Sequence, residues 1–111
     1  MVHLTGYRRV IFDLRKLENY CLNPAHSRGR HKARVFREAL GIGRADAIWL
    51  QSRLLESLES DDAVELGADS FGTRWRIDVA VARQERKAVV RTIWMVEADE
   101  DTVRFLTCWV L

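Results

Sequence analysis

The chain has 111 residues, 48% of them hydrophobic, with four tryptophans and four phenylalanines. This composition excludes a disordered chain and suits one domain with a single core. The formal net charge of +2 conceals an asymmetry, because residues 1–59 hold eleven Lys and Arg against six Asp and Glu, whereas residues 60–111 hold seven against ten. We therefore expect one domain over residues 1–111, with a basic helical half at 1–59 and a β-sheet half at 60–111.

Membrane and disulfide-rich classes are also disfavoured. No apolar run approaches the ~18 residues of a membrane helix, and the N-terminus lacks the apolar segment of a secretion signal. Cys21 and Cys108 are too far apart in the sequence to suggest a disulfide framework or a metal knuckle. We expect a cytoplasmic protein without membrane contact, in which both thiols are reduced and buried.

The first predicted helix begins after Asp13, whose side chain can cap it. Its buried side follows the spacing i, i+3, i+7, with Leu14, Leu17 and Cys21. The pair Asn23-Pro24 ends this helix after about two turns, because a residue before proline avoids the helical region.

The second predicted helix follows residues 27–29, runs through Leu40 and ends at Gly41, which suits a left-handed C-cap. Its exposed stripe is basic and contains Arg30, Arg34 and Arg37. Its apolar stripe contains Lys32, Val35, Phe36 and Ala39. Lys32 is therefore predicted to point inward, although a lysine at this position can also snorkel along the edge of a core.

Asp46 and its neighbours open a third helix, whose inner side holds Trp49 or Leu50, Leu54 or Leu55, and Leu58. Its outward residues are predicted to be Gln51, Arg53 and Glu56. The periodicity then changes to that of strands, at 74–82, 88–96 and 103–111, with a polar hairpin loop at 84–87. We expect an α+β fold, with N-terminal helices packed on a four-stranded antiparallel sheet. The last strands are apolar on both faces, so the face without helices could contact a second copy or another protein.

Positive charge is concentrated in one segment, and no carboxylate occurs from Asn19 through Arg37. A polyanion, and RNA in particular, is therefore the expected partner. The candidate substrate-binding residues here are Arg28, Arg30, His31 and Arg34. The alternative is that these side chains form an ordinary solvated helix face.

Metal-independent RNA cleavage needs a base for the 2′-hydroxyl proton, cations for the phosphorane charge and an acid for the leaving oxygen. His26 precedes a helix N-terminus and could be the base or the acid, although it could also be an ordinary loop histidine. Lys32 could reach polar residues within the apolar strands, which are Arg91, Thr92, Arg104 and Thr107. We expect no metal and no cofactor, since His3, His26 and His31 lack ligand spacing.

Four segments resemble a small bacterial family of unassigned function: KLENYCLNPAHSRGRHKARVFREALGI, GTRWRIDV, AVVRTIWMVE and VRFLTCWVL. The family pattern is K-L-x-x-Y-x-L-N-P-x-H-x-x-G-x-x-K-A-x-x-F-x-x-x-L-G, followed by strands ending in T-x-W and L-T-x-x-Y-V. The resemblance covers residues 16–111. It departs at Val103, where the family has proline, and at Trp109, where it has tyrosine, which puts activity in question if that tyrosine takes part in the chemistry.

Members of this family look like standalone short proteins and like C-terminal modules of large secreted toxins, which implies a toxic nuclease. The order of elements is similar to that of the barnase, EndoU, colicin and RelE-like ribonucleases, although this is an analogy of fold. The pattern falls on His26, Gly29, Lys32, Thr92, Trp94 and Thr107, with Arg91 and Arg104 beside them.

The resulting hypothesis is a metal-independent endoribonuclease, acting as the toxin of a toxin–antitoxin or immunity pair. Its catalytic residues would be His26, Lys32, Arg91, Thr92 and Thr107, with Trp94 and Arg104 among the substrate contacts. The alternative is a non-catalytic interaction protein, such as an antitoxin, that binds a partner or a second copy through its sheet.

Overall fold

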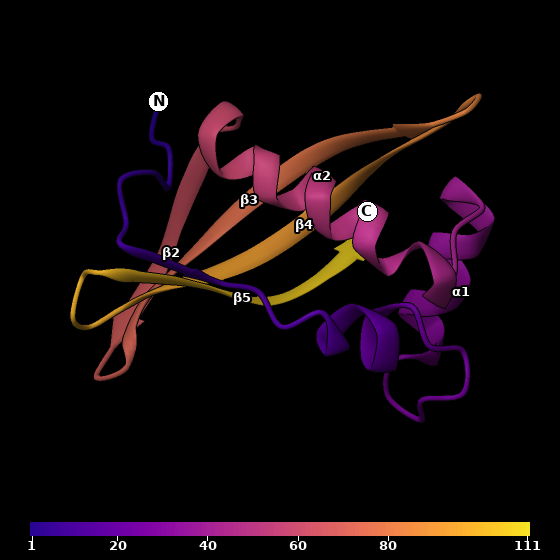
Figure 1. The fold of residues 1–111 in the computed structure, drawn as a ribbon, viewed down its shortest axis with the longest axis horizontal. Coiled ribbons are helices and arrows are strands. Elements are labelled where there is room, and N and C mark those ends of the chain that lie inside the picture. Colours follow the sequence, from indigo (N-terminus) through magenta and orange to yellow (C-terminus); the bar gives the residue numbers. More distant parts are fainter.

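We describe the protein from a computed structural model of residues 1–111. The helices lie in the N-terminal half of the chain and most of the sheet lies in the C-terminal half (Figure 1). The elements in chain order are β1 (Arg9–Ile11), the π-helical turn η1 (Leu17–Cys21), α1 (Arg30–Leu40), the 3-10 turn η2 (Arg44–Asp46), α2 (Ala47–Ser60), β2 (Ala63–Asp69), β3 (Gly72–Arg83), β4 (Arg86–Glu97) and β5 (Thr102–Val110).

The sheet has five strands in the order β1-β5-β4-β3-β2 and is mixed. Strands β2 to β5 pair antiparallel, whereas β1 pairs parallel with the first residues of β5. The predicted α+β fold is therefore confirmed, but its sheet of four antiparallel strands was incomplete. Strand β1 lies within the short apolar run at residues 7–12, but its parallel pairing with β5 joins distant parts of the chain, which a local pattern does not reveal.

The helices agree closely with the sequence pattern. Helix α1 ends at Gly41, which is left-handed with φ of 69°, and the Asp13 carboxylate accepts a hydrogen bond from the Arg15 backbone at 3.0 Å. The first helix differs in its π-helical closure, where the Leu22 amide donates to Leu17 O. The prediction that Gln51 points outward was wrong, because its half-buried side chain donates to Phe12 O at 3.1 Å. None of the helices could span a membrane.

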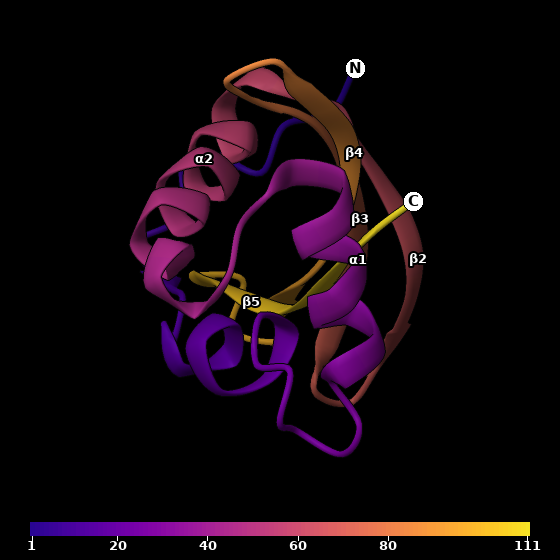
Figure 2. The ribbon, with the colours of Figure 1, turned by 90° about the vertical axis from the view of Figure 1, so that its right-hand side faces the viewer.

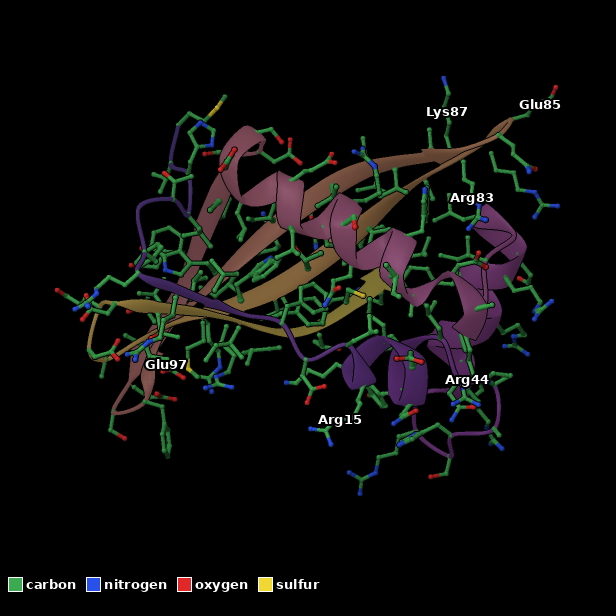
Figure 3. All side chains as sticks on the ribbon, in the orientation of Figure 1. Arg15, Arg44, Arg83, Glu85, Lys87 and Glu97 are labelled. Atoms are coloured by element: carbon green, nitrogen blue, oxygen red, sulfur yellow. The ribbon has the colours of Figure 1, made fainter.

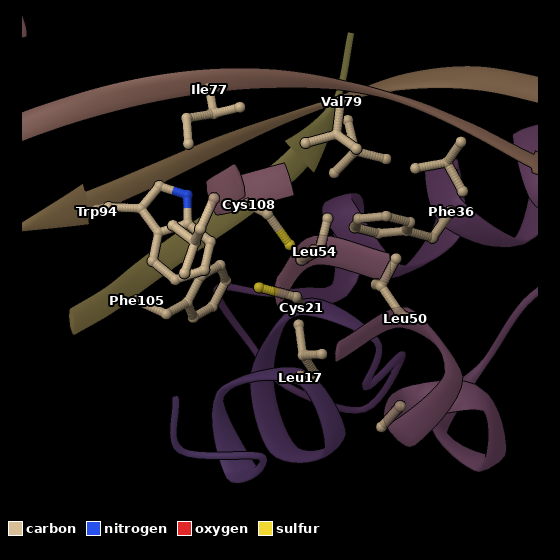
Figure 4. Close-up of a cluster of buried hydrophobic side chains, with 14 of the residues drawn as sticks. Leu17, Cys21, Phe36, Leu50, Leu54, Ile77, Val79, Trp94, Phe105 and Cys108 are labelled. Atoms are coloured by element: carbon tan, nitrogen blue, oxygen red, sulfur yellow. The ribbon is translucent and has the colours of Figure 1, made fainter. Parts of the chain in front are cut away.

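One hydrophobic core lies between the helices and the inner face of the sheet (Figure 4). Phe105 is at its centre, stacked on Phe12 with ring centroids 4.0 Å apart and edge-on to Trp94 at 5.2 Å. Both cysteines are free and fully buried, and the fold brings Cys21 of η1 beside Cys108 of β5. The buried position of both thiols was predicted, but their proximity was not.

The outer face of the sheet carries no helix (Figure 2). Its half-buried residues include Ile93 and Met95 on β4, between ion pairs such as Arg91–Asp78 and Arg104–Glu97. Charged side chains also extend beyond the tip of the β3–β4 hairpin, where Glu85 and Lys87 project into solvent (Figure 3). This hairpin turn lies between Arg83 and Arg86 and is shorter than the predicted loop.

Candidate functional site around Lys32

The Lys32 ammonium is held at the junction of α1, η1 and β5. Its Nζ donates a hydrogen bond to Thr107 Oγ1 at 3.0 Å. Two aromatic rings flank it, with centroids at 4.9 Å for Tyr20 and 5.3 Å for Trp109. Cation–π contacts of this kind hold an ammonium in place without neutralising it. No carboxylate forms an ion pair with Lys32, so its positive charge remains available to an anion.

A cavity of about 480 Å³ opens beside this ammonium. It is lined by His31, Lys32, Val35, Trp109 and Val110. The indole of Trp109 forms an apolar wall next to a positive charge. This combination suits a nucleotide, because aromatic rings stack with bases and ammonium groups bind phosphate.

A β-bulge in β5 places Thr107 where Lys32 can reach it. The register shifts so that Ile93 pairs with Thr107 and Trp94 pairs with Phe105, which leaves Leu106 without a partner. Lys16 donates to the freed Leu106 carbonyl at 3.3 Å. Bulges commonly re-aim a side chain next to an active site.

The buried cysteines continue this polar network into the core. Thr107 Oγ1 accepts from Lys32 and lies 3.8 Å from the Cys21 sulfur, to which its own proton can be donated. A hydrogen bond from Cys108 lowers the pKa of Cys21 to about 6, with smaller contributions from Thr107 and Lys32, whereas burial opposes this shift. Burial raises the pKa of the Cys108 thiol. The Cys21 sulfur thus helps to orient the Thr107 hydroxyl that accepts the hydrogen bond from Lys32.

His26 is placed by contacts with the backbone at the start of α1. Its Nδ1 accepts hydrogen bonds from the amides of Arg28 and Gly29, both at 3.0 Å. Its ring packs edge-on against Tyr20, with centroids 4.9 Å apart. Because an amide N–H can only donate, Nδ1 must be unprotonated, and the ring proton lies on Nε2.

This tautomer limits what His26 can do. An occupied Nδ1 and a protonated Nε2 leave no free lone pair to take a proton, and the ring bears no second proton to give. In this geometry His26 is placed to donate a hydrogen bond through Nε2, while its Nδ1 is engaged by the backbone and is not free for the acid or base chemistry that the sequence suggested.

Two substitutions test how much the backbone hydrogen bonds of His26 contribute to stability. The variant His26→Ala should lose about 1 kcal/mol of unfolding free energy because two amides lose their acceptor, whereas His26→Asn should retain stability, since asparagine accepts the same bonds. Urea denaturation tests this, and equal losses of stability in His26→Ala and His26→Asn would contradict the backbone role of the ring.

The structure places the other predicted catalytic residues away from Lys32 or engages them elsewhere. Thr92 is fully buried, where it donates to Ile77 O at 2.7 Å and accepts from Trp94 Nε1 at 2.7 Å. Trp94 is likewise fully buried in the core. A hydroxyl and an indole without exposed surface cannot touch RNA, so both residues are structural.

The two strand arginines lie on the outer face. Arg91 pairs across the strands with Trp109, but its guanidinium makes two hydrogen bonds to Asp78, at 2.9 and 3.0 Å. These contacts are the main reason that the pKa of Asp78 is lowered. Arg104 donates to Glu97 at 2.8 Å. Both arginines are therefore ion-paired within the chain, although Arg91 lies beside Trp109, which lines the cavity.

The predicted substrate-binding residues at the start of α1 are all exposed, namely Arg28, Arg30, His31 and Arg34. The first turn of α1 has no acidic residue. Cations at a helix N-terminus are unfavourable, because the helix dipole is positive there. This arrangement lowers the stability of α1.

Replacing Arg30 by glutamate should therefore stabilise the protein. The expected gain is about 0.3–1 kcal/mol from the helix dipole, with a further contribution from the new i, i+4 pair with Arg34. Thermal and urea denaturation at low ionic strength measure it. A loss of stability would show that Arg30 has a structural role.

Sequence reasoning missed four contributors to this site: Lys16, Tyr20, Cys21 and Trp109. Lys16 and Tyr20 occur in the family pattern, which was the available signal for them. Trp109 was noted only as a departure from that pattern, and no local signal connects Cys21 with Thr107.

The profile of one known protein family matches residues 3–111 of the chain. The chain belongs to the DUF6883 family, a domain of unknown function. This DUF6883 chain thus falls in a family of unassigned function, as the resemblance predicted. No match was found among curated proteins.

A solved structure shares the DUF6883 fold seen here. It is a chain from a contact-dependent growth inhibition toxin–immunity protein complex of Klebsiella pneumoniae 342. The TM-score is 0.70 at 16% sequence identity, over 91% of this chain and 99% of the other. At this identity the likeness establishes a common fold.

Proposed function

We propose that this DUF6883 protein is the toxin of a toxin–immunity pair and cleaves RNA without a metal ion. The observation that carries the proposal is the Lys32 ammonium, fixed between Tyr20, Thr107 and Trp109 with no carboxylate paired to it, at an open cavity. The fold shared with a chain of a toxin–immunity complex supports the biological setting.

In the proposed reaction the 2′ oxygen of a ribose attacks the adjacent phosphorus. The bond from phosphorus to the 2′ oxygen forms and the bond to the 5′ oxygen breaks. One water molecule accepts the 2′-hydroxyl proton and another donates a proton to the departing 5′ oxygen. The products are a 2′,3′-cyclic phosphate and a 5′-hydroxyl. Lys32 opposes the charge that develops on the phosphorane and supplies N–H donors to it.

The neighbours of Lys32 hold the substrate in this scheme. His26 donates from Nε2 to a phosphate oxygen, and Trp109 stacks on a base. Thr107 accepts a hydrogen bond from Lys32 and lies 3.8 Å from the Cys21 sulfur, so it orients the ammonium and is a positioning residue. Its hydroxyl is not needed in contact with RNA.

Expression in bacteria tests the proposed toxicity. The wild-type protein should arrest growth and fragment cellular RNA, and co-expression of its cognate antitoxin or immunity protein should prevent both effects. Normal growth with intact RNA, at a level of soluble protein that matches a known toxin, would contradict the proposal.

The uncovered outer face of the sheet supports a second candidate function, a non-catalytic interaction module. Ile93 and Met95 are half-buried there without a helix above them. Such a module would bind a partner protein or form a homodimer, and it would never be toxic. Size-exclusion chromatography with the product of the adjacent gene, together with the growth assay, distinguishes the two functions.

A further inference from the structure

A second basic groove lies on the flank of α1 that faces away from Thr107. It has a volume of about 420 Å³. Its apolar residues are Leu22, Pro24, Ala33 and Ile42, which form the floor. Its basic residues are Arg30, His31, Arg34 and Arg37, which form the rim. Gly43 completes the wall, and no carboxylate lines the groove.

The arginines of this groove have no acidic partner. The protein has eight ion pairs, and none of them uses Arg30, Arg34 or Arg37. Asp46 is close enough for Arg37 to lower its pKa slightly, but Asp46 is paired with Arg83 at 2.6 Å. Three guanidinium groups that share one groove without a counter-ion attract a polyanion more strongly than isolated surface arginines do.

The position of the groove relates it to Lys32. His31 lines both this groove and the cavity beside Lys32, so the two adjoin across the first turn of α1. A helix is about 10 Å wide, and successive phosphates of a strand advance by about 3.4 Å along a duplex axis. A strand that occupies both sides of α1 must therefore extend over about three nucleotides or more.

We propose that this groove, formed by Arg30, His31, Arg34 and Arg37, is a second RNA-binding subsite that holds phosphates flanking the cleaved bond. The inference rests on the proposed function and specifies its substrate as an RNA chain rather than a dinucleotide. The apolar floor accommodates a sugar or base, while the arginines contact phosphate without reading sequence.

The test compares two triple variants of equal charge. The groove variant carries Arg30→Gln, Arg34→Gln and Arg37→Gln. The control carries Arg9→Gln, Arg53→Gln and Arg74→Gln, which remove arginines that are already paired with Asp99, Glu56 and Asp69. Glutamine favours helices almost as well as arginine, so α1 should persist, and circular dichroism checks this.

Binding is measured with a twelve-nucleotide RNA whose 2′ oxygens are methylated, so that it cannot be cleaved. The groove variant should bind at least about tenfold more weakly than wild type at moderate salt. Its plot of log affinity against log salt should be shallower by about 2, since each phosphate neutralised on a single strand contributes about 0.7. Cleavage of an unmodified twelve-nucleotide RNA should fall at least about tenfold more than cleavage of ribodinucleotides.

The readouts separate this inference from the proposed function. A wild-type protein that binds the methylated RNA through the groove but cleaves no RNA retains the subsite and contradicts the nuclease. A groove variant that matches the control triple in affinity and salt dependence overturns the subsite, even if RNA is cleaved. Failure of the wild-type protein to bind the methylated RNA would also overturn the subsite. The same holds if the groove variant binds this RNA as wild type does but no longer binds its partner protein.

Discussion

Replacing Lys32 by methionine is expected to reduce RNA cleavage by about 10²–10³-fold. This range is typical when one preorganised donor to a developing negative charge is removed. Methionine has a side chain as long as the lysine stem without its ammonium and makes favourable contacts with aromatic rings such as those of Tyr20 and Trp109, which flank the ammonium, so the fold should persist. Single-turnover cleavage of a labelled RNA in EDTA measures the effect.

The matched control for this substitution is Lys87→Met. Lys87 is an exposed lysine near the tip of the β3–β4 hairpin, where its side chain projects into solvent (Figure 3). The same change of charge there should alter cleavage less than about twofold. Equal activity of Lys32→Met and Lys87→Met would exclude Lys32 from the chemistry.

The substitution Gly29→Ala should reduce RNA cleavage about as strongly as Lys32→Met, although it removes no functional side chain. An added Cβ would lie 2.2 Å from Tyr20 O, which is closer than any tolerated contact. The backbone at Gly29 has φ of −89°, so the conflict is steric and does not arise from an unfavourable dihedral angle. To relieve it, α1 must move away from Tyr20, and the Gly29 amide must leave His26.

We expect Gly29→Ala to lower the unfolding free energy by about 1–3 kcal/mol and cleavage by about 10²-fold, as for small misplacements of other active sites. Gly41→Ala at the other end of α1 is the control. It strains a left-handed residue by about 1–2 kcal/mol but leaves Tyr20 and His26 in place. Cleavage well below the melting temperature should fall only for Gly29→Ala, and equal activities would show that this packing does not set the site.

The features that followed from the sequence are those controlled by local pattern. The exposed basic stripe and the inward position of Lys32 arise from the 3.6-residue period of one helix, and the C-cap at Gly41 from the ease with which glycine adopts a left-handed conformation. The contact between Lys32 and Thr107 was anticipated in kind, because polar residues within apolar strands require partners. These patterns did not determine which of the four polar strand residues contacts Lys32. The candidates were Arg91, Thr92, Arg104 and Thr107.

The features that escaped prediction depend on tertiary contacts. Strand β1 is three residues long and is stabilised by its parallel pairing with β5. The bulge at Leu106 shifts the alternation of β5, so that Cys108 pairs with Thr92 in the core while Thr107 pairs with Ile93 and contacts Lys32. The ionic partners of Arg91 and Arg104 likewise depend on strand register. His26 was assigned acid–base chemistry from its residue type, but its tautomer depends on two backbone amides that only the fold brings to it.

The most direct test of the account is cleavage of a purified RNA by the wild-type protein in EDTA, followed by analysis of the product ends. We predict fragments with 2′,3′-cyclic phosphate and 5′-hydroxyl ends, and no cleavage when every 2′-hydroxyl is replaced by hydrogen. Intact RNA under these conditions, from protein that is folded and monodisperse, would contradict the assignment of this site to metal-independent RNA cleavage.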